Sequence, residues 1–250
     1  MKANSRVMSV VLMVWGICQS VWALPSGENL TFVVRWGAIT GGYSSLSIHD
    51  AEPIAGQPAY HIVAEARSTG AVDKFYRVRD VNESWIGNAP LGTLRYAKQI
   101  HEGQYRVEEE TVLNQDTHRF HNHSYRIDKN EYEDKDGVIP PNALDVLGSL
   151  YYVRTLPLAV GQSYVIDVHS GDKVYPLVVN VKKRQTVKVR VGKFDCFLVE
   201  PQLRGPGIFV SKGKKLEVWL TADDRHMPVL MRSEVFIGHV SAELVNQTVL

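Results

Sequence analysis

Three histidines within six residues are the first group whose chemistry could matter. His118, His121 and His123 stand in the stretch THRFHNHS, residues 117–124. Imidazole is a good zinc ligand, but a zinc site needs three or four ligands. On a β-strand His121 and His123 share one face, while His118 points to the other. Since no further ligand stands at metal-like spacing, we predict an exposed polar strand and no metal site.

Asp223, Asp224 and His226 crowd another short stretch and could resemble acid–base machinery. Aspartate is also a favoured turn residue, because its side chain bonds the local backbone. The stretch TADDRHMP, residues 221–228, lies between two apolar runs. We therefore interpret it as a turn.

The other candidates for catalysis have simpler interpretations. Glu109 lies between two further glutamates, so on a strand it faces away from both, whereas paired carboxylates must face each other across a cleft. Cys196 alternates with Phe194 and Leu198, a pattern typical of a small core residue. The chain has no G-x-S-x-G nucleophile motif and no phosphate-binding glycine loop. We predict no catalytic residue, no cofactor and no enzymatic activity.

Apolar and aromatic side chains near one arginine are better candidates for binding. Arg154 follows an apolar segment, where a cation complements the dipole of a helix. Alternatively, it marks the polar mouth of an apolar cavity and meets an anionic head group. Aromatic residues could line such a cavity or belong to an ordinary core. The predicted ligand-binding set is Leu147, Tyr151, Arg154, Trp36 and Trp219.

The element that must position three of these residues is a helix over residues 142–156, NALDVLGSLYYVRTL. Two prolines precede it, Asn142 is a good N-cap, and Pro157 disfavours continuation. Its length would be about 20 Å. Asp145, Ser149 and Tyr152 make one narrow polar stripe, and apolar residues cover the rest. Such a helix should be surrounded by protein.

Most of the remaining chain alternates apolar and polar residues between turn signals, which predicts strands. The expected strands cover 30–36, 43–49, 59–67, 75–85, 94–101, 105–113, 117–127, 161–169, 173–181, 187–191, 194–200, 216–220, 229–238 and 239–245. Two loops are expected, a charge-dense one over 128–136 and a Gly/Pro/Lys-rich one over 204–215. The fold class is therefore all-β and mainly antiparallel. We predict a single large curled sheet or barrel of roughly a dozen or more strands, with one helix inserted midway.

Residues 1–23 have the pattern of a cleaved signal peptide. Lys2 and Arg6 precede an apolar run of about 11 residues, short of the roughly 20 that a membrane span requires. We expect export to the periplasm and a single β-barrel-like domain over 24–250, without a membrane span. Its near-neutral charge argues against nucleic acid as a partner. With Cys196 as its one cysteine, it can form no internal disulfide.

Several stretches resemble a known family. They are residues 145–154 with Pro157 and Gly161, residues 191–195 running to Glu200 and Pro201, residues 216–224 followed by Pro228 and Val229, and the pairs Trp36–Gly37 and Gly41–Gly42. In order and spacing they resemble the exported bacterial family known as domain of unknown function 3108, over about residues 30–245. The resemblance implies a periplasmic β-rich protein with no assigned activity. It carries no catalytic residue.

Two functions remain open at this point. The first is a periplasmic carrier or sensor of a lipid-like or other hydrophobic small molecule, held between a curled sheet and the helix. The alternative is an envelope assembly or interaction factor that holds a protein partner through sheet edges and the loops at 128–136 and 204–215. A hydrolase with an unusual site ranks below both. The structural question is whether the helix fills the barrel or covers a space inside it.

Overall fold

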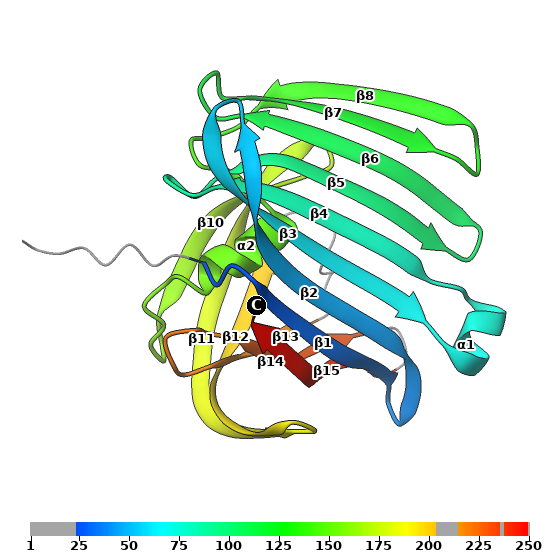
Figure 1. Ribbon diagram of the computed structural model, residues 1–250, viewed down its shortest axis with the longest axis vertical. Coiled ribbons are helices and arrows are strands. Elements are labelled where there is room, and N and C mark those ends of the chain that lie inside the picture. The colour runs from blue at the N-terminus through cyan, green and yellow to red at the C-terminus, as the bar shows by residue number, and fades with distance from the viewer. Residues whose placement is uncertain (1–23, 204–214, 236–237, 250) are drawn as a thin grey trace, which may run out of the picture.

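The computed structural model describes residues 24–203, 215–235 and 238–249 (Figure 1). The expected signal peptide and nearly all of the expected loop at 204–215 lie outside these residues. The first half contains β1 (Glu28–Trp36), β2 (Ile39–Ile54), β3 (Gln57–Ser68), α1 (Gly70–Phe75), β4 (Arg79–Gly87), β5 (Thr93–Glu102), β6 (Tyr105–Asn114), β7 (Arg119–Arg126) and β8 (Glu131–Val138).

The second half begins with the short strand β9 and the helix α2, and six strands follow. Its elements are β9 (Leu144–Asp145), α2 (Val146–Val153), β10 (Ser163–Ser170), β11 (Lys173–Val189), β12 (Gly192–Leu203), β13 (Leu216–Thr221), β14 (Pro228–Glu234) and β15 (His239–Val249).

All fifteen strands belong to one sheet, in the order β8-β7-β6-β5-β4-β3-β2-β1-β15-β14-β13-β12-β11-β10-β9. Neighbouring strands are antiparallel except β9 and β10. β1 pairs with both β2 and β15, so the first and last strands lie side by side at the middle of the sheet. The edge strands β8 and β9 do not pair with each other, so the barrel is not closed. The predicted all-β curled sheet with a helix midway is confirmed.

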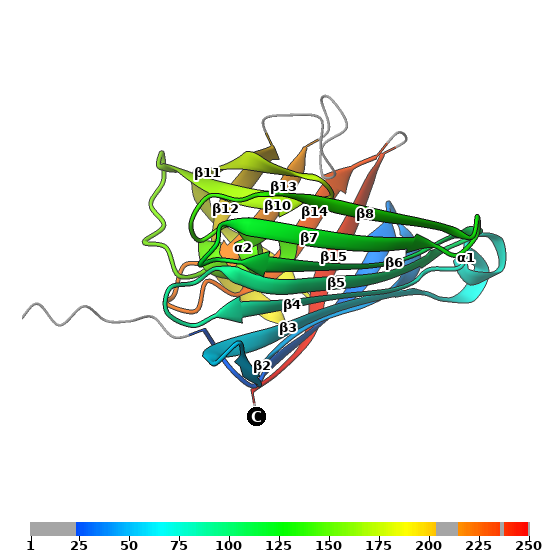
Figure 2. The ribbon, with the colours of Figure 1, turned by 90° about the horizontal axis from the view of Figure 1, so that it is seen from above.

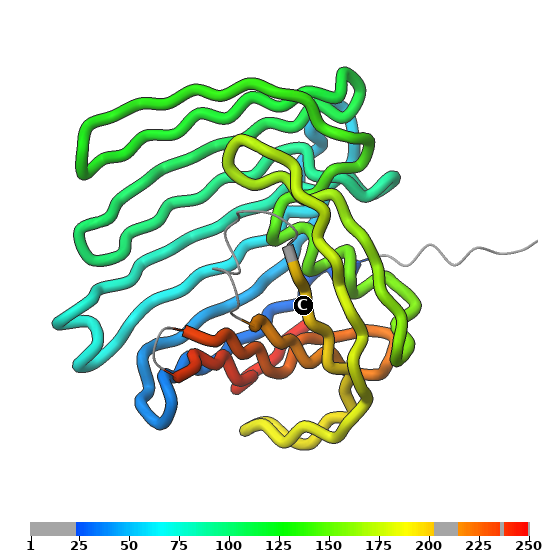
Figure 3. The backbone as a smooth tube through the Cα atoms, turned by 180° about the vertical axis from the view of Figure 1, so that it is seen from behind, coloured from blue at the N-terminus to red at the C-terminus, as the bar shows by residue number. Residues whose placement is uncertain are grey.

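The sheet folds into two layers that diverge from its middle strands. Seen from above, β2–β8 form one layer, β10–β15 contribute the other, and α2 lies between them (Figure 2). From behind, β10–β12 bend around α2, while β4–β8 extend well beyond it (Figure 3). A main apolar core joins the inner faces of both halves and α2, through buried residues such as Phe32, Ile62, Tyr151, Val168 and Leu220. The helix is thus surrounded by protein, as predicted.

The helix is shorter than predicted, and its start was placed wrongly. Asn142 lies in a turn with φ of +59°. Ala143 accepts a hydrogen bond from Thr93 N, so the chain runs extended into β9 before α2 begins at Val146. The N-cap is Asp145. Pairing with distant strands therefore overrides the local signals of the double proline and the asparagine.

The charge-dense segment at 128–136 was also predicted wrongly as a loop. Its larger part is β8, which pairs with β7 from Arg119↔Val138 to Arg126↔Glu131. The strand is mostly exposed and lies at the sheet edge. Charged side chains are common on edge strands, because they discourage pairing with other chains.

Two further differences from the prediction are small. The helix α1 precedes β4, which starts later than predicted, and the strands predicted at 173–181 and 187–191 are one bulged strand, β11.

Candidate functional site

A buried carboxylate fixes the start of α2 against the first half of the sheet. One oxygen of Asp145 accepts hydrogen bonds from Leu147 N at 2.7 Å and Gly148 N at 2.9 Å. The other accepts from Ser84 Oγ, on β4, and from Thr93 Oγ1 on β5 at 2.6 Å. Burial raises the pKa of the Asp145 carboxyl above its usual range, and these four donors oppose that shift. Asp145 thus joins α2 to two strands.

Gly148 permits this close approach of the helix to the sheet. A Cβ at this position would lie 3.0 Å from Ile86 Cγ2 and 3.0 Å from Asp145 Oδ2. Real Cβ atoms rarely come so near, so any side chain here would push α2 away from β4. The first turn of α2 is therefore held by a cap and by a glycine contact.

A buried ion pair fixes the other end of α2. Arg154 Nη1 lies 2.7 Å from Glu28 Oε1, and its Nη2 lies 2.8 Å from Glu28 Oε2. Arg154 Nε donates to the carbonyl of Arg225 at 3.3 Å, and the Arg154 carbonyl lies 2.8 Å from His226 Nδ1. Both charged side chains are almost wholly buried, at 1% and 3% exposed. The guanidinium thus joins α2 to β1 and to the turn before β14.

Between these two fixed ends, α2 covers an apolar cavity of about 320 Å³. From the helix, the cavity is lined by Val146, Leu147, Ser149, Leu150 and Val153. The second half of the sheet supplies Leu177, Val179, Val199, Pro201, Leu216, Val218 and Met231. The first half supplies Ala64, Asn82 and Tyr96. The Ser149 hydroxyl donates to the Val146 carbonyl at 2.7 Å, so the helix presents an apolar surface to this space.

A second cavity of about 190 Å³ adjoins the first and shares Asn82, Tyr96 and Val146 with it. We call it the polar cavity because charged side chains line it, although Ile100, Tyr105 and Val107 give it apolar surface as well. Its walls include Lys98, Glu109 and Thr111 from β5 and β6, together with His169, Ser170 and Gly171 at the end of β10. Lys98 Nζ lies 2.8 Å from Glu109 Oε2, and the two side chains are 19% and 11% exposed. Charge is thus concentrated beside the apolar cavity.

His169, which also lines the polar cavity, is a buried histidine with an unpaired ring nitrogen and a lowered pKa. The residue is 3% exposed, and its Nε2 has no hydrogen-bond partner among the described residues. Burial lowers the pKa of His169 to about 4; the charge of Asp172 opposes this shift, and the charge of Lys98 adds to it. The ring is therefore neutral at pH 7. Leaving such a polar atom unpaired costs about 1–3 kcal/mol.

The structure separates the five residues predicted to bind a ligand. Leu147 lines the apolar cavity. Tyr151 is fully buried in the core, with the Arg154 guanidinium 4.9 Å from its ring centre, and neither residue lines the cavity. Trp219 is buried in β13 beside Arg232, and Trp36 is half exposed at the end of β1. The pairing of Arg154 with Glu28 corresponds to a structural role for this arginine.

Sequence reasoning missed the residues that the strands bring to the cavities. Asn82 faces Lys98 across the β4–β5 pair, and Lys98 faces Glu109 across β5–β6. This register places all three on the inner face of the first half of the sheet. One feature of the sequence could have indicated these residues: Glu109 was predicted to face away from Glu108 and Glu110. In the structure Glu109 indeed bonds Lys98 at the polar cavity, while Glu110 pairs with Arg95 elsewhere.

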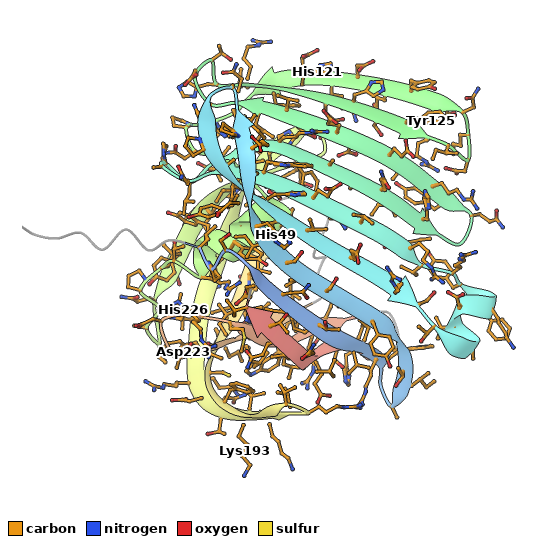
Figure 4. The ribbon with its side chains drawn as sticks, viewed as in Figure 1. His49, His121, Tyr125, Lys193, Asp223 and His226 are labelled. Atoms are coloured by element: carbon orange, nitrogen blue, oxygen red, sulfur yellow. The ribbon has the colours of Figure 1, made fainter. Side chains whose placement is uncertain are left out.

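His121 lies near the far edge of the first half, and it shares β7 with His123 (Figure 4). His121 Nδ1 is 3.1 Å from Asp136 Oδ1, and His123 Nδ1 is 2.7 Å from Asp134 Oδ1, on an exposed surface. His118 lies in the preceding turn, with φ of +54°. The predicted exposed polar strand is confirmed. Within the described ranges, no group of three or more His, Cys, Asp or Glu residues could hold a metal ion.

The Asp223 segment is a turn between β13 and β14, as predicted (Figure 4). Asp223 accepts hydrogen bonds from the Thr221 hydroxyl at the end of β13 and from Arg225 within the turn. Cys196 is fully buried, and burial raises the pKa of its thiol to about 12. The thiol is therefore protonated at pH 7, consistent with the predicted small core residue.

The matching family model, "Protein of unknown function (DUF3108)", covers residues 31–245. The chain belongs to this family. The resemblance noted in the sequence is thereby confirmed. A search of curated proteins finds no match for this DUF3108 protein.

One solved structure shows the same kind of fold. The DUF3108 chain is similar to a β-barrel-like protein of domain of unknown function DUF1849 from Brucella abortus, with 11% identity and a TM-score of 0.61. That match covers 91% of this chain and 99% of the other. A putative exported protein with YmcC-like fold from Bacteroides fragilis NCTC 9343 has 9% identity, the same coverage and a TM-score of 0.36. In the part of the DUF3108 chain that the structure covers, no helix is long and apolar enough to cross a membrane.

Proposed function

We propose that this DUF3108 protein is a periplasmic carrier or sensor that binds a lipid-like or other hydrophobic ligand beneath α2. The observation that carries the proposal is the apolar cavity of about 320 Å³. Protein interiors contain few voids larger than a water molecule, and cavities of about 300–1,000 Å³ are typical of small-molecule sites. A helix anchored at both ends beside such a space covers it without filling it.

The cavity walls favour an apolar ligand over a polar one. α2 supplies four aliphatic side chains, and β11–β14 supply most of the opposite wall. Each buried methylene of a ligand would contribute about 0.8 kcal/mol. We expect binding without turnover: among the described residues that line this space, Ser149 carries the one aliphatic hydroxyl, and it is already bonded to Val146 O.

A single substitution should block the cavity. Ala64 lies on β3 and lines the cavity from the side of the first half. Ala64→Phe should place a ring in this space and weaken binding of the fluorescent apolar probe N-phenyl-1-naphthylamine at least tenfold. Ala66→Phe is the matched control, because Ala66 lies on the same strand and face but does not line the cavity. Equal probe binding by the wild type and a folded Ala64→Phe variant would contradict the proposal.

The periplasmic location belongs to the same proposal. It is supported by the charged start and the short apolar run of residues 1–23. Fractionation of the producing cell tests it: the protein should be recovered in the periplasm, with Leu24 as its first residue. Recovery of the uncleaved chain in the cytoplasm would contradict it.

The alternative is an envelope assembly factor that holds a protein partner, and one observation favours it. β8 is an exposed edge strand, so one side of its backbone is open to pairing with an added strand. Its acidic side chains are of the kind that discourages such pairing, so we rank this function second. Cross-linking from β8 in intact cells tests it, and a specific partner captured there but not from β11 would support it.

A further inference from the structure

We propose that the ligand is a single-chain amphiphile with a zwitterionic head group, whose tail occupies the apolar cavity and whose head lies against Lys98, Glu109 and His169. This inference rests on the proposed function and specifies the class of ligand. Its starting point is that the apolar and polar cavities share Asn82, Tyr96 and Val146. The two cavities therefore adjoin, and among the described residues charged side chains line the second but not the first.

The charges of the polar cavity match a head group that carries both signs. Lys98 and Glu109 lie 2.8 Å apart, so their charges cancel. A head group with one charge would bring that charge close to a like charge in the wall. A zwitterion can instead direct its anion to Lys98 and its cation to Glu109. The existing pair uses one of the three ammonium donors and one of the two carboxylate oxygens, so both groups retain capacity for a ligand.

His169 adds an uncharged polar side chain to this wall. The residue lines the polar cavity, while its Nε2 is sealed from solvent and has no hydrogen-bond partner among the described residues. Because the ring is neutral at pH 7, it makes the wall more polar without adding charge.

The junction of the two cavities fits the uncharged linker of such a molecule. Tyr96 OH donates to Asn82 Oδ1 at 3.0 Å, which leaves the two donors of the Asn82 amide nitrogen for a ligand. At about 320 Å³, the apolar cavity lies at the lower end of the range for small-molecule sites, so it suits a single short tail.

Three amphiphiles with the same decanoyl chain test the inference by isothermal titration below their micelle concentrations. The zwitterionic probe is decanoyl lysophosphatidylethanolamine, the anionic probe is decanoyl lysophosphatidylglycerol, and the uncharged probe is monodecanoylglycerol. We expect the zwitterion to bind at least tenfold more tightly than either of the others. In Lys98→Met and in Glu109→Gln this preference should fall below threefold. Lys188→Met, which removes an exposed lysine of β11 that lines neither cavity, should leave it unchanged.

The outcomes separate this inference from the proposed function. If all three amphiphiles bind the wild type equally, or the anionic one binds best, the zwitterion inference is wrong while the apolar cavity remains a binding site. If none of the three binds and none displaces N-phenyl-1-naphthylamine, the proposed function is wrong as well. The comparison on the wild type needs no variant, so the inference stays open to refutation even if Lys98→Met does not fold.

Discussion

His169 links the polar cavity to the pH dependence of stability. Its pKa is about 4 in the folded protein against 6.5 for an ordinary histidine, because burial disfavours the charged ring. The unfolded chain therefore binds a proton more readily between these values, and stability is lost as the pH falls from 6.5 to 4. The full shift corresponds to roughly 3 kcal/mol.

Replacement of this histidine should remove that part of the pH dependence. Between pH 7 and pH 4.5, the wild type should lose about 1–3 kcal/mol more unfolding free energy than His169→Leu, as measured by urea denaturation. The control is His118→Asn, in the exposed turn before β7, which should follow the wild type. Parallel pH curves for the wild type and His169→Leu would show that the ring is not held neutral by burial.

At the scale of elements, α2 depends on anchors at both ends. The Arg154–Glu28 pair joins its C-terminal end to β1. Arg154→Met should leave the Glu28 carboxylate buried without its partner, which typically destabilises a protein by about 3–5 kcal/mol. The double variant Arg154→Met/Glu28→Gln should be more stable than the single variant, because it removes both charges. Denaturant unfolding measures both, and a single variant as stable as the double would show that the pair does not hold the helix.

Sequence patterns predicted some of these elements correctly and missed others. Alternation predicted most strands, because one face of each packs on the core while the other meets water. The start of α2 was missed because Thr93, about fifty residues earlier in the chain, draws residue 143 into an extended conformation. β8 was missed because an edge strand with charges on both faces has no apolar alternation. Of the predicted binding residues, only Leu147 reached the cavity.

The rest of the candidate site was beyond sequence reasoning for a physical reason. Its walls join Ala64, Lys98 and Glu109 in the first half to Val179 and Met231 in the second. Which of these residues meet depends on strand register and on the curl of the whole sheet. A single sequence contains the alternation within each strand but not the register between distant strands.

At the scale of the whole molecule, the open curl of the sheet accounts for the cavities. The two layers diverge from β1, β2 and β15, and α2 lies between them. A closed and fully packed barrel would leave no such space. In this molecule, the helix packs on the first half through Asp145 and Gly148. The apolar cavity remains between the helix and β11–β14.

The central claim is that the apolar cavity holds the apolar part of a ligand. It is tested most directly by a crystal structure of the protein grown with 10-bromodecanol, in which the anomalous signal of bromine locates the chain. The account predicts one strong bromine peak between α2 and β11–β14, among Leu150, Val179 and Val218, and its loss in Ala64→Phe. A bromine peak confined to the outer surface, with side chains packed across the space beneath α2, would contradict it.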